Sequence, residues 1–173
     1  GKLDNELKML SKNSKINIVN ADLSENNILN QLDTDYDLIF HFAAILGVQN
    51  VLEQPYKVLD SNMLLTSNAI SIAKKQKSLE CFIFSSTSEV YAGSLEKNLL
   101  EIPTKESSYI VLPENKKPRT SYMLSKVYGE AMCMHSGIPY LIVRPHNIYG
   151  PRMGMSHVIP QLIEKADKEI NNG

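Results

Sequence analysis

Apolar residues follow two alternating patterns along the chain, one typical of helices and the other of strands. Apolar positions three or four residues apart predict helices over residues 2–12, 24–32, 58–75, 121–135 and 158–170. Short runs rich in β-branched and aromatic residues predict strands over residues 16–22, 36–44 and 80–86, and residues 139–151 predict a further strand that runs into a loop. The last three of these runs are continuously apolar at their centres, which predicts strands buried on both faces.

Strand and helix alternate over the whole length, which predicts an α/β fold with a parallel sheet and helices on both faces. In such sheets ligands bind at the carboxyl ends of the strands. We therefore expect a site where the predicted strands end, at Asn20–Asp22, Phe42–Ala44, Ser85–Thr87 and Arg144–Asn147. Small or polar residues follow three of these ends, so a ligand can approach the backbone there.

Composition bounds the class of protein. The 173 residues, 43% hydrophobic and 21% charged, are enough for one globular domain with a core. A net charge of −1 gives no attraction for nucleic acid or an anionic membrane, and no apolar run approaches the ~20 residues of a membrane span. Cys81 and Cys133 lack metal-ligand spacing, so we expect reduced thiols and no metal. A cytoplasmic protein is the prediction.

Tyr122 and Lys126 stand four residues apart in the predicted helix 121–135. Positions i and i+4 share one face of a helix, so both side chains can act on one ligand. A free phenol has a pKa near ~10, and we expect the ammonium to lower the pKa of Tyr122 toward neutrality. A tyrosinate can then take a proton from an alcohol while a hydride leaves the same carbon. Spacing alone also fits a packed tyrosine beside a solvated lysine.

Hydroxyl and carboxyl side chains follow the predicted strand 80–86, in the run Ser85–Glu89. A hydroxyl at a strand end can bind the substrate oxygen that a tyrosine deprotonates. Serine and threonine at such places also cap turns and helices, so any single one is unspecific. The run becomes more specific together with Tyr122 and Lys126.

Five motifs, taken together, connect the sequence to a known family. They are NADLSE (20–25), HFAA (41–44), SSTSEVYA (85–92), YMLSK (122–126) and RPHNIYGPR (144–152). In this order and spacing the sequence resembles the extended short-chain dehydrogenases/reductases, the group of NAD-dependent nucleotide-sugar epimerases, dehydratases and decarboxylases. The resemblance spans most of the chain and implies a Rossmann-like, doubly wound parallel sheet.

The resemblance also implies roles for individual residues. Tyr122 would be the catalytic acid/base, Lys126 would tune it and hold the nicotinamide ribose, and Thr87 would be the hydroxyl partner. The cofactor would be NAD, with NADP also possible. His41 would be structural, holding the strand end. The implied cofactor-binding residues are Asp22, Leu23, Phe42, Ala43, Ala44, Ser85, Tyr122, Lys126 and Pro145.

On the substrate side, the resemblance implies a nucleotide sugar linked to UDP, dTDP or GDP. Its contacts would come from Thr87, Ser88, Asn147 and Arg152. Oxidation at C4 would give a transient 4-keto sugar, from which epimerisation, dehydration or decarboxylation can follow. Glu89 after the hydroxyl pair is similar to the pattern of decarboxylases and some 4,6-dehydratases, which makes it a candidate catalytic residue. It fits equally well a loop residue that caps a helix.

One departure from the family is large. The family holds the pyrophosphate on a glycine-rich turn, and the eight glycines of this sequence cannot form that motif. The acidic residue that would bind the adenosine ribose is also absent. The resemblance thus implies a partial NAD-binding domain over residues 1–173, lacking the first two strands and the C-terminal substrate domain. Residues 93–120 would form a substrate-side loop and residues 146–173 would begin the substrate domain.

Three functional interpretations remain open. The first is the nucleotide-sugar enzyme, the second a family reductase acting on a non-sugar carbonyl compound, and the third an inert fragment or interaction domain. The presence of Thr87, Tyr122 and Lys126 argues against a decayed active site. Since the family commonly pairs through two long helices, a homodimer through helices 58–75 and 121–135 is also expected.

Overall fold

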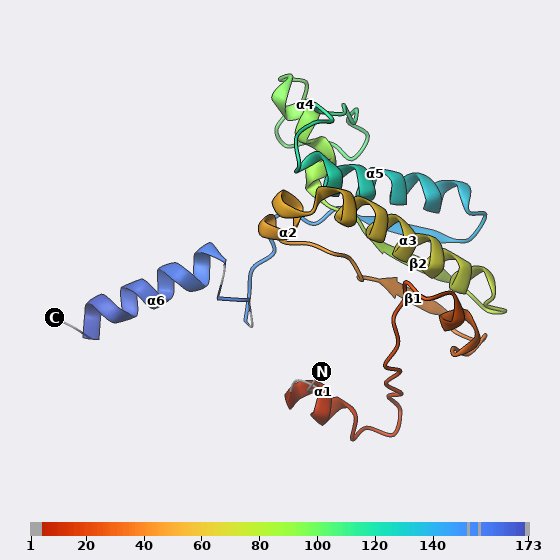
Figure 1. Ribbon diagram of the computed structural model, residues 1–173. Coiled ribbons are helices and arrows are strands. Elements are labelled where there is room, and N and C mark those ends of the chain that lie inside the picture. Colours follow the sequence, from red (N-terminus) through yellow and green to blue (C-terminus); the bar gives the residue numbers. More distant parts are fainter. Residues whose placement is uncertain (1–4, 152, 156, 172–173) are drawn as a thin grey trace.

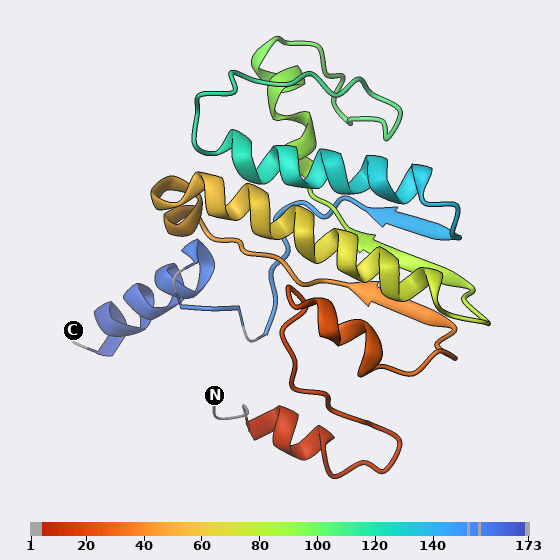
Figure 2. The same ribbon diagram turned by 45° about the vertical axis from the view of Figure 1, so that its right-hand side comes forward.

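The computed structural model describes residues 5–151, 153–155 and 157–171. At its centre is a three-stranded parallel sheet in the order β1 (Leu38–His41), β2 (Cys81–Ser85), β3 (Tyr140–Val143). The two long helices α3 (Pro55–Lys74) and α5 (Thr120–His135) lie side by side on one face of this sheet (Figures 1 and 2). The predicted α/β fold with a parallel sheet is therefore confirmed, and each long helix links two neighbouring strands. The prediction of helices on both faces is not met in the described residues, where α3 and α5 cover the same face.

Shorter elements surround this unit. They are α1 (Asn5–Leu10), η1 (Asn26–Asn30), α2 (Val48–Glu53), η2 (Ser88–Tyr91), α4 (Ala92–Glu96) and α6 (Val158–Asn171). The predicted irregular stretch 93–120 includes the end of α4 and passes over α5 (Figure 2). Helix α6 lies away from the sheet at the end of a long connection (Figure 1), and none of its described residues is buried. No helix in the described part of the chain is long and apolar enough to cross a bilayer.

The core lies between β2 and the two long helices. Phe82 and Phe84 are fully buried against Ala69 and Ala73 of α3 and Cys133 of α5. Burial of such side chains is the main stabilising contribution, at about 25 cal/mol per Å² of apolar surface. Gly129 of α5 permits the close approach, because a Cβ there would lie 2.3 Å from Cζ of Phe84.

Two strand predictions need correction. Residues 16–20 form no strand, and the apolar side chains of Ile16, Ile18 and Val19 are 37–42% exposed. A strand requires a neighbouring ladder, and the described residues provide none beside this run. Burial on both faces holds only for β2. In the edge strands, Leu38 and Phe40 of β1 and Leu141 of β3 are at least half exposed, because α3 and α5 cover only the opposite face.

The parallel register brings the strand ends together. His41 pairs with Phe84 and Ser85 pairs with Val143, so the residues that follow each strand emerge at one edge of the sheet. The turn of η1 is preceded by Asp22, whose Oδ1 accepts hydrogen bonds from Ser24 N (2.8 Å) and Ser24 Oγ (2.7 Å). The predicted helix 24–32 is thus a short 3₁₀ turn held by an aspartate. Three of the four predicted strand ends, at residues 42–44, 85–87 and 144–147, therefore meet as expected, whereas residues 20–22 follow no strand.

Candidate active site

Lys126 lies against the carboxyl end of the central strand. Its Nζ donates a hydrogen bond of 2.7 Å to the backbone oxygen of Ser85, and the residue is only 5% exposed. The Nζ atom is 5.1 Å from the ring centroid of Phe84 and 5.8 Å from that of Tyr122. Burial lowers the pKa of Lys126 to about 8. The predicted solvated alternative for this lysine is therefore wrong.

Tyr122 is half-buried one turn before Lys126, but its pKa moves opposite to the expectation. Burial of the phenol, and then the charge of Glu89, raise the pKa of Tyr122 above its usual value. The Lys126 ammonium donates to Ser85 O instead of to the phenol, so desolvation dominates at the tyrosine. The phenol is consequently protonated at neutral pH, the form that donates a proton to a carbonyl oxygen.

Thr87 and Glu89 lie in the turn after β2. The Thr87 hydroxyl caps η2 by accepting a hydrogen bond of 3.2 Å from Glu89 N, which leaves its own proton free to donate. The Glu89 carboxylate pairs with Arg119 at 3.7 Å on a half-exposed surface. Glu89 therefore does not cap a helix with its side chain, and its charge reaches Tyr122.

The loops after β2 and β3 are bonded to each other. Ser88 N donates to Pro145 O (3.0 Å), and Ser88 Oγ lies 2.7 Å from Nδ1 of His146. Asn147 is exposed, has a left-handed backbone (φ 44°) and places its Nδ2 3.3 Å from Nε2 of His146. The structure thus brings Ser88, Pro145 and Asn147 to one place. Arg152, the other predicted substrate residue, lies outside the described residues.

Several of the predicted cofactor-binding residues gather along the free edge of β1. Leu23, Phe42 and Ala43 line a hollow of about 200 Å³, and Ala44 follows directly in the chain. The Asp22 carboxylate is exposed, and its hydrogen bonds from Ser24 lower its pKa. An apolar wall, an exposed carboxylate and the buried Lys126 ammonium fit the adenosine and nicotinamide-ribose parts of a dinucleotide. A glycine-rich turn for the pyrophosphate is not in the sequence.

His41 has the predicted structural position. It is 4% exposed, and its ring centroid lies 6.0 Å from that of Phe82 and 5.9 Å from that of Phe84. Its Nε2 lies 3.2 Å from Thr66 Oγ1. Burial, and then the charge of Lys126, lower its pKa to about 4. His41 is therefore neutral at physiological pH and joins the strand end to α3.

Sequence reasoning missed the buried polar residues that support the site. Asn62 of α3 accepts from Ile45 N (2.7 Å), donates to Ile45 O (3.0 Å), and also donates to Ser125 Oγ (3.3 Å). It thereby fixes the loop after β1 to both long helices. An asparagine one turn from Val58 and from Thr66, on the inner side of an amphipathic helix, was the available indication.

Glu130 was missed as well, and Arg144 was placed at a strand end without a role of its own. Glu130 is i+4 from Lys126, so Tyr122, Lys126 and Glu130 share one face of α5. Its carboxylate forms a two-point ion pair with Arg144, with the shortest contact at 2.6 Å. Three polar residues on one helix face were the indication in the sequence.

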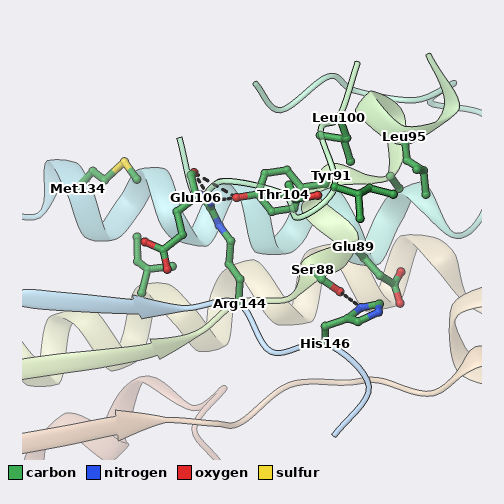
Figure 3. Close-up of a pocket in the computed structure, with 13 residues that line it drawn as sticks. Ser88, Glu89, Tyr91, Leu95, Leu100, Thr104, Glu106, Met134, Arg144 and His146 are labelled. Atoms are coloured by element: carbon green, nitrogen blue, oxygen red, sulfur yellow. Dashed lines mark hydrogen bonds between the residues drawn. The ribbon is translucent and has the colours of Figure 1, made fainter. Parts of the chain in front are cut away.

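A larger hollow of about 890 Å³ opens beside these groups (Figure 3). Ser88, Glu89 and His146 line one part of it, and Arg144 with Tyr91 and Glu106 another. Tyr122, Lys126 and Thr87 are not among its lining residues. Among the described residues, no group of three or more histidine, cysteine or acidic side chains is placed to hold a metal ion.

The chain is similar in sequence to known proteins. The sequence profile described as the NAD dependent epimerase/dehydratase family matches residues 3–171. The chain is 34% identical over 157 residues to UDP-N-acetyl-alpha-D-glucosaminuronate decarboxylase of Bacillus cytotoxicus, covering 87% of this chain and 46% of that protein. The chain thus spans about half the length of the curated relatives it matches.

Solved structures give the same picture. UDP-glucuronic acid 4-epimerase of Bacillus cereus, in complex with UDP-4-deoxy-4-fluoro-glucuronic acid and NAD, is 25% identical, with a TM-score of 0.66 over 93% of this chain and 50% of that one. The dTDP-glucose 4,6-dehydratase DesIV of Streptomyces venezuelae, with NAD bound, is 20% identical, with a TM-score of 0.72 over 95% of this chain and 49% of that one. At that identity the latter shows the fold alone.

Proposed function

The chain belongs to the NAD-dependent epimerase/dehydratase family, and from this premise we propose that the protein modifies nucleotide sugars through transient oxidation at C4. The observation that carries the proposal is the buried Lys126, bonded to Ser85 O at the end of β2 and one helical turn from Tyr122. Burying a cation in a core position lowers stability, so its retention favours a functional role.

Each of three side chains has a task in this proposal. In the reduction step the protonated Tyr122 donates its proton to the C4 keto oxygen. In the oxidation step the Tyr122 phenolate, formed once the phenol has released its own proton to solvent, takes the proton of the C4 hydroxyl. Lys126 supplies the positive charge that favours the phenolate during oxidation. The Thr87 hydroxyl, whose oxygen already accepts from Glu89 N, donates to the same sugar oxygen. NAD, when bound, supplies the hydride chemistry.

The substrate class is part of the proposal. Relatives act on UDP- and dTDP-linked sugars by their names, which supports a UDP-, dTDP- or GDP-linked substrate here. We assign substrate contacts to Thr87, Ser88 and Asn147, to residues 93–120 as a substrate-side loop, and to residues 146–173 as the start of a substrate domain. Asp22, Leu23, Phe42, Ala43, Ala44, Ser85 and Pro145 are assigned to the cofactor side.

The fate of the keto sugar depends on Glu89 in this proposal. The charge of Glu89 raises the pKa of the Tyr122 phenol, and Glu89 follows Thr87 in the turn after β2, which supports a second acid/base group on this side of the site. Simple 4-epimerisation does not use such a group, whereas dehydration and decarboxylation do. Glu89 therefore favours the dehydratase and decarboxylase classes.

Replacing Glu89 by glutamine in the full-length protein tests this assignment. We expect product formation to fall by about 10²-fold or more, while the oxidation step, followed as NADH absorbance, changes little. The matched control is Glu80→Gln, an exposed carboxylate just before the amino end of β2, away from the site. Unchanged product formation in Glu89→Gln would contradict a role for Glu89 and favour a 4-epimerase.

A direct experiment tests the function itself. The full-length protein is purified, its nucleotide is released by acid and identified, and the protein is incubated with UDP- and dTDP-sugars, with and without a C6 carboxylate. We expect bound NAD and conversion of one sugar class. Conversion of a non-sugar carbonyl alone would support a family reductase, and a full-length protein without bound or binding nucleotide would support an inert interaction domain.

We also propose a homodimer through α3 and α5. The outer sides of these helices carry apolar side chains, with Leu64 40% and Tyr128 48% exposed. Sedimentation of the full-length protein is expected to give twice the monomer mass. Leu64→Glu should shift it toward monomer, whereas monomeric wild-type protein would contradict the assignment.

A further inference from the structure

A buried polar network connects the end of the central strand to α5 and to the substrate-side loop. Ser86, 2% exposed, donates from its hydroxyl to Glu130 Oε1 at 2.5 Å. Arg144, at the end of β3, donates from Nε to Oε1 (2.8 Å) and from Nη2 to Oε2 (2.6 Å) of the same carboxylate. The side chains of Glu130 and Arg144 are 3% and 18% exposed. Such a planar, two-point pair has a defined geometry as well as a charge.

The other side of the guanidinium reaches the substrate-side loop. Arg144 Nη1 donates to the hydroxyl of Tyr91 and to the backbone oxygen of Glu106 (3.0 Å), and the guanidinium carbon lies 5.1 Å from the Tyr91 ring centroid (Figure 3). Tyr91 in turn donates to Glu106 O at 3.1 Å. One arginine therefore joins β3, α5, η2 and the loop 93–120.

The attachment points on β2 are informative. Ser85 holds Lys126 through its backbone oxygen, and the next residue, Ser86, holds Glu130 through its hydroxyl. Lys126 and Glu130 are one turn apart on α5, about 6 Å along the helix axis. The two hydrogen bonds, Lys126 to Ser85 and Ser86 to Glu130, hold α5 at two points one turn apart, so the helix cannot slide or rotate against the strand end. Tyr122 lies on the same helix one turn before Lys126, so its position is held as well.

We propose that Glu130, Arg144 and Ser86 are positioning residues, which fix α5 against the end of β2 so that Tyr122, Lys126 and Thr87 meet on one sugar oxygen. This inference rests on the proposed function for its catalytic meaning. Its structural content, the placement of Lys126 against Ser85, does not depend on which sugar is used. Displacement of a reacting group by about 1 Å costs on the order of 10²-fold in rate, so a network of this kind has a measurable effect.

The test compares Ser86→Ala, Glu130→Gln and Arg144→Lys in the full-length protein. We expect kcat to fall on the order of 10²-fold in each, with KM for the nucleotide sugar changing by less than about 3-fold. Arg144→Lys keeps the positive charge but loses the planar guanidinium that pairs with both oxygens of Glu130. A lysine at this position should therefore not retain the wild-type kcat. The matched control is Glu53→Gln on α2, an exposed carboxylate that accepts a hydrogen bond from Gln49 Nε2 (3.0 Å), and it should leave kcat unchanged.

A second readout does not need turnover. The pKa of the Lys126 ammonium, followed by NMR, is expected to rise from about 8 in Ser86→Ala and Glu130→Gln, because the amine leaves its buried place at Ser85 O. Ser86→Ala removes one hydroxyl and preserves the Glu130–Arg144 pair, so it tests the proposal even if Glu130→Gln fails to fold.

Wild-type kcat together with an unchanged Lys126 pKa in Ser86→Ala would overturn the inference. A wild-type kcat in Arg144→Lys would overturn it as well. If the wild-type protein converts no nucleotide sugar, the proposed function fails. The Lys126 titration then still decides whether the network places this side chain.

Discussion

Replacing Tyr122 by phenylalanine in the full-length protein is expected to lower kcat by about 10³- to 10⁴-fold, the upper range for loss of a general acid/base. The substitution removes only the hydroxyl, and the half-buried ring keeps its packing beside Lys126. KM should change little, since the phenol acts mainly in the transition state. The measurement is steady-state conversion of the accepted nucleotide sugar, together with NADH absorbance during a single turnover.

Tyr140→Phe is the matched control for this change. Tyr140 lies at the amino end of β3, away from the site, and is 43% exposed, so loss of its hydroxyl should leave kcat within about 2-fold, as for most surface substitutions. If Tyr122→Phe retained more than about a tenth of the activity, well outside the range of an acid/base loss, Tyr122 would not be the acid/base. Glu89 and His146, two titratable groups that follow β2 and β3, would then be the candidates to replace next.

Replacing Lys126 by methionine should abolish most of the activity. At pH 7 the same substitution should leave the free energy of unfolding nearly unchanged or raise it. The activity loss is expected to be about 10²-fold or more, because the Lys126 ammonium, 5.8 Å from the Tyr122 ring centroid, is the positive charge that we propose to stabilise the phenolate formed during the reaction. The stability effect follows from burial. The pKa of Lys126 falls to about 8 from 10.5 in the folded protein, and at 1.36 kcal/mol per unit this corresponds to about 3 kcal/mol of unfavourable burial when the amine is charged.

The pH dependence has a definite sign. Below pH 8 the folded and unfolded states both hold the proton, so the folded state bears the full cost of burying the charge. Between about pH 8 and 10.5 the unfolded state binds more protons than the folded state, and the wild-type protein therefore gains stability as the pH rises. Methionine lacks this gain, and it leaves Ser85 O without its donor, at a cost of about 1–3 kcal/mol.

Denaturant unfolding at pH 7 and pH 10 measures the difference. The Lys126→Met variant should be as stable as the wild type or more stable at pH 7, and less stable at pH 10. Lys57→Met, at an exposed position of α3, is the control and should show no such change between the two pH values. A stability difference between Lys126→Met and wild type that does not depend on pH would mean that Lys126 is not buried as described.

Local patterns were sufficient for the helices and for the order of the elements. The apolar spacing of residues 58–75 and 121–135 predicted α3 and α5 within a few residues, because helix periodicity arises within one segment. The same spacing placed Tyr122 and Lys126 on one face, and the motifs at the strand ends identified the family. The parallel sheet followed from the alternation of strands and helices.

Strands depend on neighbours that are distant in the sequence, and there the patterns were insufficient. The run 16–20 has strand composition but forms none, because the described chain provides no adjacent ladder. Phe40 and Leu141 have the composition of buried strands, yet they are exposed because α3 and α5 cover only one face.

The sequence by itself determined the fold class, the family and the candidate residues Tyr122, Lys126 and Thr87. Tertiary structure alone decided the electrostatics and the support of the site. The pKa of Tyr122 rises because packing desolvates the phenol, and Lys126 turns to Ser85 O because that carbonyl ends the central strand. Ser86, Glu130 and Arg144 meet from three elements far apart in the chain. Contacts of this kind have no period in the sequence, so only the folded arrangement reveals them.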